Sequence, residues 1–111
     1  MMRARLRKLL QEAMNKVGIY DGNIRIVLYP IKRKIASVSL KTKSIRLNKY
    51  IIQNLDDDII IFILVHELIH IKLGSTTHDT RFWQEITRLY PDEKITEIEA
   101  RLIYAASFKP F

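Results

Sequence analysis

The chain has 111 residues, of which 48% are hydrophobic and 28% are charged, and its formal net charge at pH 7 is +7. A chain of this size and composition forms one domain with a buried core, which argues against disorder and fibrous architectures. The absence of cysteine from the sequence excludes disulfides, thiolate metal ligands and cysteine nucleophiles. The basic first residues are not followed by the apolar run of a signal peptide, so we expect a cytoplasmic protein.

The positive charge is concentrated in the first half of the chain. Residues 1–50 hold thirteen Lys or Arg against two acidic residues, whereas residues 51–111 hold six against ten. Such an asymmetry can indicate an anionic partner, for example nucleic acid. However, no aromatic residues are interleaved with the basic ones as in a single-strand binding platform. Nucleic acid is therefore a partner that the sequence permits but does not favour.

The first half of the chain predicts a helix followed by a small sheet. Apolar residues recur at three- and four-residue spacing from Met2 to Val17, and Gly18 follows as a C-terminal cap. Residues 24–29 alternate in polarity as a half-buried strand does. Residues 35–40 and 44–47 flank a short polar turn, which predicts a hairpin. We therefore expect about three strands.

The second half predicts helices. A helical turn is expected at 50–55, and it is followed by the almost continuously apolar segment 59–73. This segment is too short to span a bilayer, which takes about 20 residues, so we expect a buried central helix and no membrane span. Asn54 or Asp56 is expected to cap its start, and Gly74 its end.

Two amphipathic helices are expected after the central one, at residues 79–90 and 92–107. The apolar residues that we expect to face the core are Phe82, Trp83, Ile86 and Leu89 in the first and Ile95, Ile98, Leu102 and Ile103 in the second. No repeat or linker divides the chain. The sequence thus predicts a single α+β domain over residues 1–111: an N-terminal helix, a three-stranded sheet, a central helix and two further helices.

The central helix carries the residues with the clearest chemistry. His66 and His70 are separated by four positions, so both imidazoles project from one helix face and can bind one Zn²⁺. Glu67 lies beside them, where its carboxylate can take a proton from a metal-activated water. Polar side chains in so apolar a helix are costly unless they are paired, and a metal explains all three at once.

A zinc site needs a third protein ligand, and catalysis needs the fourth position for water. The best candidate is His78, because the turn that begins at Gly74 can bring it back to the metal. The spacing is wrong for a metzincin, whose third histidine would fall on Thr76. A glutamate from a later helix is the alternative, and the residues available are Glu85, Glu93 and Glu97.

Other residues have weaker claims to a role. Asp79 and Glu85 could each orient an imidazole, or could equally be surface carboxylates. The residues that could stabilise an oxyanion are Arg46, Arg81, Tyr90 and Tyr104, and the sequence does not choose among them. An extended substrate could pair with a strand edge, for which residues 35–40 or 44–47 are the natural supplier.

Between residues 37 and 91 the sequence resembles the soluble gluzincin-like metallopeptidases of the YgjP-like, WLM and SprT-like group. The matching stretches are residues 44–48, 65–70 and 78–83. The size of the chain and the histidine in third position are most similar to the minigluzincins, which are relatives of the catalytic domains of integral-membrane gluzincins. Residues 35–39 differ from the Trp-Gly-Ser-Cys segment typical of YgjP-like proteins, which puts a substrate role specific to that branch in doubt.

The resemblance implies a zinc endopeptidase with metal ligands at His66, His70 and His78 and a general base at Glu67. It also implies latency, because minigluzincins are described as zymogens whose C-terminal segment blocks the cleft. Residues 92–111 could act in this way, within one chain or by exchange between two self-associated copies. Ordinary core packing explains the same helix equally well.

Three functions are therefore compared. The first, which we favour, is a latent zinc endopeptidase that acts on peptide or protein substrates. The second is a SprT-like or WLM-like protease recruited to DNA or nucleoprotein through a patch made of Arg3, Arg5, Arg7, Lys32, Arg33, Lys34, Lys41 and Lys43. The third is a non-catalytic scaffold stabilised by zinc. Glu67 argues against the scaffold, because a structural zinc site needs no base and usually fills all four positions.

Overall fold

A computed structural model describes residues 2–30 and 34–106 of the chain, with side chains as far as residue 103. The elements follow one another as α1 (Met2–Val17), β1 (Arg25–Tyr29), β2 (Ala36–Ser39), β3 (Ser44–Asn48), η1 (Ile52–Asn54), α2 (Asp57–Leu73), α3 (Thr80–Leu89) and α4 (Asp92–Ala106). Both the order of the elements and the α+β class agree with the sequence prediction.

The sheet has the strand order β1-β3-β2, so the last strand in the chain lies in the middle. β2 and β3 pair antiparallel, which confirms the predicted hairpin, whereas β1 pairs parallel to β3. The expectation that residues 44–47 could offer an edge to a substrate is wrong, because both edges of β3 are already paired. Its side chains Ile45 and Leu47 are fully buried. The strands at the edges are β1 and β2.

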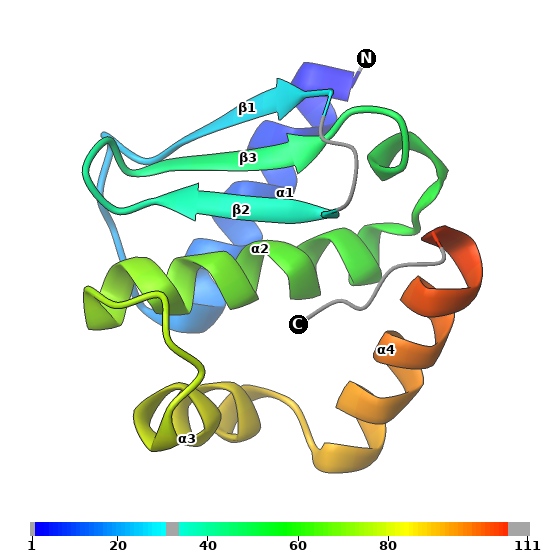
Figure 1. Ribbon diagram of the computed structural model, residues 1–111. Helices are drawn as coiled ribbons and strands as arrows, with labels where there is room; N and C mark the ends of the chain where they lie inside the picture. The colour runs from blue at the N-terminus through cyan, green and yellow to red at the C-terminus, as the bar shows by residue number, and fades with distance from the viewer. Residues whose placement is uncertain (1, 31–33, 107–111) are drawn as a thin grey trace.

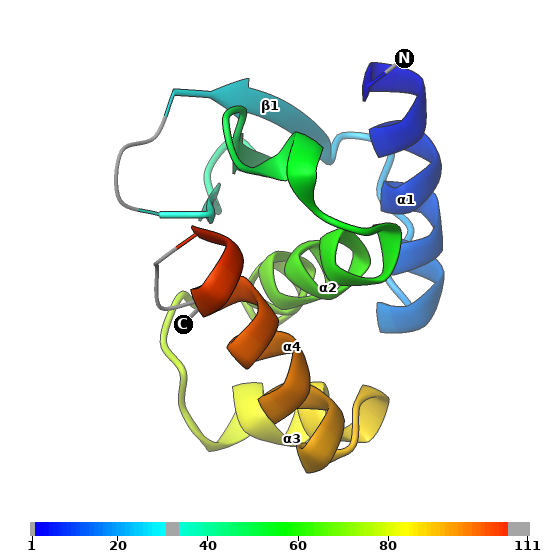
Figure 2. The same ribbon diagram turned by 90° about the vertical axis from the view of Figure 1, so that its right-hand side faces the viewer.

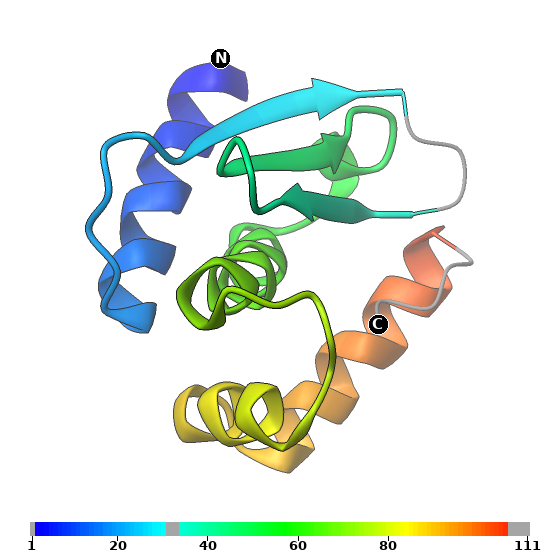
Figure 3. The same cartoon turned by 60° about the vertical axis from the view of Figure 1, so that its left-hand side comes forward.

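The molecule is layered from the sheet through α2 to α3, with α1 beside both the sheet and α2 (Figures 1 and 2). Every residue from 59 to 70 is buried, which explains why α2 is apolar on all sides. From the end of α3, α4 leads back toward the sheet (Figure 3). None of the helices in the described ranges combines the length and hydropathy needed to cross a membrane.

The ends of α2 differ in how well the sequence predicted them. Gly74 caps the C-terminus in the left-handed region at φ +65°, and its N–H bonds to the carbonyls of His70 and Ile71. Asp56 occupies the N-cap position, but its side chain makes no capping hydrogen bond. Its carboxylate instead accepts a hydrogen bond of 2.6 Å from Arg101 of α4. Thus the acidic start of α2 anchors another helix.

Two of the residues predicted to face the core do not. Phe82 and Ile86 of α3 are fully buried as expected, but the side chain of Trp83 is 39% exposed. One residue advances an α-helix by about 100°, which turns Trp83 away from the face that Phe82 buries. In α4, Ile98 and Leu102 are buried while Ile103 is 47% exposed, for the same reason.

Candidate metal centre

Three imidazoles converge on one point beside α2. The Nε2 atom of His66 lies 3.2 Å from Nε2 of His70 and 3.1 Å from Nε2 of His78. One nitrogen from each ring lies within 4.8 Å of the other two, so the cluster could hold a metal ion. His66 and His70 come from successive turns of α2, as their spacing predicts, and His78 comes from the segment that links α2 to α3.

The turn after α2 orients one of these rings. Nδ1 of His70 lies 2.9 Å from the carbonyl oxygen of Ser75, which can only accept a hydrogen bond. The proton of a neutral His70 is therefore on Nδ1, and Nε2 presents its lone pair to the cluster. The left-handed conformation of Gly74 allows the chain to fold back in this way. Sequence analysis missed this role of Ser75, because the hydrogen bond is made by its backbone carbonyl and does not depend on its side chain.

His78 is positioned by α3, which begins two residues later. The carboxylate of Asp79 caps this helix by accepting a hydrogen bond of 3.2 Å from the Phe82 N–H. That hydrogen bond is the main reason why the pKa of Asp79 is lowered. The indole N–H of Trp83 donates to the carbonyl oxygen of His78 at 3.1 Å. Together these bonds fix the backbone that follows the imidazole.

The ring of Phe82 forms the floor of the cluster. Its centroid lies 4.8 Å from the centroid of each of the three imidazoles, and it is stacked on His70 with an interplanar angle of 19°. Phe82 was predicted only as a core residue, and the structure shows that this part of the core directly supports the histidines. An aromatic residue four positions after His78 was the signal available in the sequence.

Burial determines the protonation of the site. It lowers the pKa of all three imidazoles, most strongly that of His66, whose side chain is also close to the other two histidines. The neutral form, which offers a lone pair to a metal, is thereby favoured. Burial has the opposite effect on the neighbouring carboxyl group. It raises the pKa of Glu67 to about 7, although the positive charge of Lys34 lowers it.

The cluster opens into a cleft of about 360 Å³ between α2 and the edge strand β2. The residues that line it are Lys34, Ile35, Ala36, Ser37, Val38, His66, Glu67, His70, Thr76 and His78. His66, Glu67 and His70 are buried at its base, whereas His78 lies at its exposed mouth. Three imidazoles, a carboxyl group and a strand edge that is unpaired within the described residues therefore face one cleft.

The other candidates from the sequence lie elsewhere. The carboxylate of Glu85 accepts from Lys72 at 3.0 Å and from Arg88 at 3.1 Å, and that of Glu97 pairs with a lysine of its own helix. These contacts give Glu85 a role in joining α2 to α3. Asp79, the other residue expected to orient an imidazole, caps α3. Glu93 lies exposed in the first turn of α4.

The residues considered for oxyanion stabilisation do not line the cleft in the described part of the chain. Tyr90 is buried against Phe62, and burial raises its pKa to about 12. Arg46 lies over the ring of Tyr29 on the exposed face of the sheet. Arg81 pairs with the helix cap of α3. The side chain of Tyr104 lies outside the described residues.

A buried helix with the pattern His-Glu-x-x-His, a third histidine that joins it and a cleft bordered by a strand define a metal-dependent peptidase. The YgjP-like metallopeptidase domain model matches residues 1–102, and the chain belongs to this family. It is thus a metallopeptidase, and the resemblance noted in the sequence is confirmed.

Relatives of known sequence and structure support this assignment. An uncharacterized protein of Methanocaldococcus jannaschii is 37% identical over 100 residues, which cover 87% of this chain and 91% of the relative. The crystal structure of the metallopeptidase zymogen of Pyrococcus abyssi abylysin matches with a TM-score of 0.86 at 30% identity, over 96% of this chain and 99% of the other. The crystal structure of the metallopeptidase zymogen of Methanocaldococcus jannaschii jannalysin matches with a TM-score of 0.79 at 36% identity. This match covers 89% of this chain and 94% of the other.

Proposed function

We propose that the chain is a zinc endopeptidase in which His66, His70 and His78 hold the metal and Glu67 is the general base. The observation that carries this proposal is the spacing of the imidazole nitrogens, 3.1 and 3.2 Å for two pairs. Two nitrogens bound tetrahedrally to zinc at 2.0–2.1 Å are expected roughly 3.3 Å apart. The donor set fits as well, since neutral imidazoles are common zinc ligands and three of them leave one position for water.

Zinc bound there would activate a water molecule and polarise a peptide carbonyl. Glu67 would accept the proton of that water and return it to the leaving amine. This double role needs a carboxyl group whose pKa is close to neutral, and burial raises the pKa of Glu67 to about 7. A carboxylate of ordinary pKa would be a weaker base and would accept the proton of the water less readily.

The free edge of β2 would align the substrate. The Asn48 N–H donates to the carbonyl of Ile35 at 2.8 Å, so Ile35 bonds toward β3. Because these directions alternate along a strand, the backbone groups of Ala36 and Val38 point to the opposite side, where the cleft lies. An extended peptide can pair with them and pass its carbonyl in front of the histidines.

The segment 92–111 would keep the enzyme latent, with residues 1–91 as the catalytic unit. Leu102 of α4 lines a small hollow together with His66, Glu67 and Ala36, next to the base of the cleft. Arg101 ties this part of α4 to the start of α2 at 2.6 Å. The two structures to which the chain is similar are both of zymogens. Residues 107–111 of the proposed segment lie outside the described residues.

The first experiment measures bound zinc by mass spectrometry and cleavage of a casein-derived peptide library. We expect about one zinc per chain in the wild type, a sharp loss in His78→Ala, and zinc without cleavage in Glu67→Gln. Zinc that is undiminished in His78→Ala would refute the ligand set. Because the wild type is proposed to be latent, the rates are compared in the Arg101→Glu protein, and an added Glu67→Gln that leaves its rate unchanged would refute the role of the base.

The second experiment tests latency in the full chain, because removal of α4 would expose the buried residues beneath it. Arg101→Glu places a third carboxylate beside Asp56 and Asp58 and should release the end of α4. We expect faster cleavage than in the wild type. Arg88→Glu is the matched control, since it breaks an exposed ion pair on α3. Equal rates for the wild type and both variants, with unchanged zinc, would argue against latency through α4. If Arg101→Glu is faster, sedimentation velocity of the wild type tells an exchange between copies from a block within one chain.

The DNA-recruited alternative stays a prediction without structural support. Of the basic residues invoked for it, Arg5 and Lys43 are each paired with an aspartate. Lys32 and Arg33 lie outside the described residues. The non-catalytic zinc scaffold is not favoured either, because Glu67 lies in an open cleft beside the histidines, where a structural zinc site would need no base. A cytoplasmic location also stays a prediction.

A further inference from the structure

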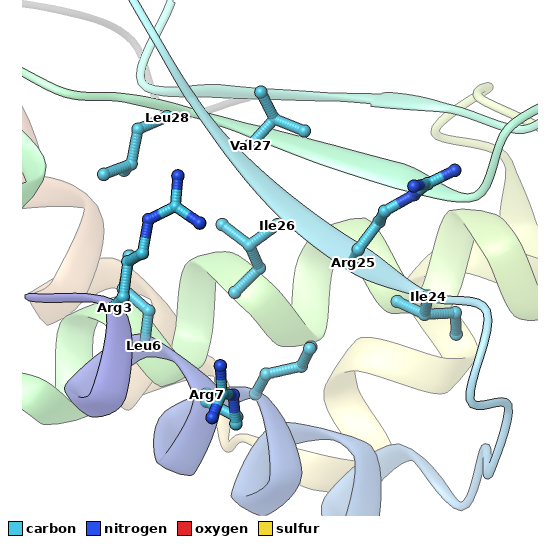
Figure 4. A pocket seen from close by; sticks show the side chains of 9 residues that line it. Arg3, Leu6, Arg7, Ile24, Arg25, Ile26, Val27 and Leu28 are labelled. Carbon is cyan, nitrogen blue, oxygen red and sulfur yellow. The ribbon is translucent and has the colours of Figure 1, made fainter.

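A second concave site lies at the other edge of the sheet from the candidate metal centre. It is a groove of about 440 Å³ between α1 and β1, lined by Arg3, Leu6, Arg7, Leu10, Ile24, Arg25, Ile26, Val27 and Leu28 (Figure 4). Because the strand order is β1-β3-β2, this groove and the peptidase cleft border opposite edges of one sheet. We call it the α1/β1 groove.

The backbone of β1 offers unused hydrogen-bonding positions to this groove. The Arg25 N–H donates to Lys43 and the carbonyl of Tyr29 accepts from Lys49, so these two residues of β1 bond toward β3. Bonding directions alternate along a strand, which points the N–H and C=O groups of Ile26 and Leu28 away from β3. In the described part of the chain, β3 is the only strand that pairs with β1. β1 can therefore accept a further strand.

The side chains around this edge divide into an apolar floor and a basic rim. Leu6 and Ile24 are buried, and Ile26 and Leu28 are half-buried above them. Figure 4 shows the side chains of Ile26 and Leu28 on the side of α1, and those of Arg25 and Val27 on the other face of the strand. Aliphatic side chains of a bound strand would find contacts with the floor.

The rim carries three arginines that lie on both sides of the edge. Arg3 and Arg7 are four positions apart on α1 and face the groove from one side, while Arg25 projects from the other face of β1. All three are exposed. Within the residues that the structure describes, none of the three guanidinium groups forms an ion pair with a carboxylate.

We propose that the α1/β1 groove binds an extended acidic peptide segment of a partner protein, which adds to β1 as a fourth strand. Side chains of an extended strand point alternately to its two faces. Acidic residues on one face of the added strand would meet Arg3 and Arg7, and those on the other face would meet Arg25. This binding does not depend on the peptidase activity or on zinc.

A peptide fits this groove better than a nucleic acid does. The free edge offers alternating N–H and C=O groups, which match a polypeptide backbone and not a sugar-phosphate backbone. None of the nine described residues that line the groove is aromatic, so they offer no platform on which bases could stack. Charge complementarity with three arginines then selects an acidic strand.

The test uses a fluorescein-labelled peptide of four Glu and four Val, arranged so that each face of the extended strand carries two Glu. Binding to the full-length Glu67→Gln protein is followed by fluorescence anisotropy, and this background prevents cleavage of the probe. We expect saturable binding that weakens with salt, and no binding of a peptide with Lys in place of Glu. No binding of the acidic peptide would overturn the proposal and leave the arginines as protection of the edge against aggregation.

Two charge-reversed proteins locate the site. Arg7→Glu with Arg25→Glu should weaken binding about 100-fold, since each arginine contact is worth about tenfold. Lys8→Glu with Lys41→Glu makes the same change in net charge at exposed residues outside the groove, and it should weaken binding by less than about threefold. Equal losses in the two proteins would refute the groove as the site.

Two further probes distinguish strand addition from simple charge attraction. Two N-methylated versions of the peptide are made, one methylated at its odd-numbered residues and the other at its even-numbered residues. Only the version whose methylated positions would face β1 should lose binding. The amide signals of Ile26 and Leu28 should shift in NMR spectra on addition of the unmodified peptide. Equal binding of both versions would refute strand addition. A thymidine oligonucleotide that binds more tightly than the peptide, and loses binding in Arg7→Glu with Arg25→Glu, would reassign the groove to nucleic acid.

Discussion

The two edges of the sheet both present backbone groups that point away from β3, but their surroundings differ. Beside β2 lie three imidazoles, whose lowered pKa values favour the neutral form, and a buried carboxyl group. Among the described residues that line this cleft, Lys34 is the only basic one. Beside β1 lie three exposed arginines and an aliphatic floor. In our two proposals both edges pair with an extended peptide, so the flanking side chains decide the fate of the bound strand. The β2 edge would carry out chemistry on that strand, and the β1 edge would only bind it.

The largest effect should come from a change that removes chemistry at one edge and leaves the other intact. Glu67→Gln keeps the size of the side chain but cannot accept a proton, so we expect peptide cleavage to fall by about 10³-fold or more. Zinc content and binding of the acidic peptide to the α1/β1 groove should not change. If peptide binding were lost together with cleavage, both activities would belong to one site and the comparison would fail.

The same substitution should change the pH dependence of stability in metal-free protein. Burial raises the pKa of Glu67 to about 7, so the folded state binds this proton more tightly than the unfolded state does. The resulting contribution is favourable at low pH and is lost as pH rises from about 4.5 to 7, which amounts to about 3 kcal/mol. Glu67→Gln should therefore be more stable than the wild type at pH 8 by about that amount, relative to their difference at pH 4.

Urea denaturation of EDTA-treated protein at the two pH values measures this effect. The three histidines act in the opposite direction, because their lowered pKa values make the folded state lose stability as pH falls. They are present in both proteins, so their contribution cancels in the comparison. A difference between the wild type and Glu67→Gln that is the same at pH 4 and pH 8 would show that the carboxyl group is not buried as described.

A smaller effect should follow when one free N–H is removed from each edge. Ala36→Pro deletes an N–H that faces the peptidase cleft, and we expect kcat/KM to fall about tenfold because one substrate hydrogen bond is lost. Ile26→Pro deletes an N–H that faces the α1/β1 groove. It should weaken binding of the acidic peptide and leave the rate of cleavage near that of the wild type. Circular dichroism and thermal melting of both variants verify that the sheet is retained. If Ala36→Pro cleaved normally, the substrate would not pair with β2.

The sequence predicted the elements far better than their arrangement. Periodicity located the four helices, and the spacing of His66 and His70 predicted that both rings share one face of α2. The hairpin of β2 and β3 was predictable because its contacts are local. The parallel pairing of β1 with β3 was not, since it joins residues about twenty positions apart and no turn dictates it. That pairing decides which edge borders the cleft.

Details of the candidate site escaped sequence analysis for a similar reason. The carbonyl of Ser75 that orients His70 depends on a left-handed glycine and leaves no trace in residue type. Phe82 was assigned to the core, and only the packing of α3 against α2 brings its ring under all three imidazoles. Asp79 was considered as a partner of an imidazole, although its position before an amphipathic helix also suits an N-cap.

The smallest effect should come from that cap. Asp79→Ala removes the hydrogen bond to the Phe82 N–H, which we expect to destabilise the protein by about 1 kcal/mol. Because the segment before α3 carries His78, zinc should also bind less tightly, whereas binding of the acidic peptide at the far edge should be unaffected. Asp79→Asn is the matched control, since asparagine is an equally good cap, and it should restore both stability and zinc affinity. If Asp79→Asn behaved like Asp79→Ala, the negative charge and not the cap would support the site, and Asp79 would act on the imidazoles electrostatically.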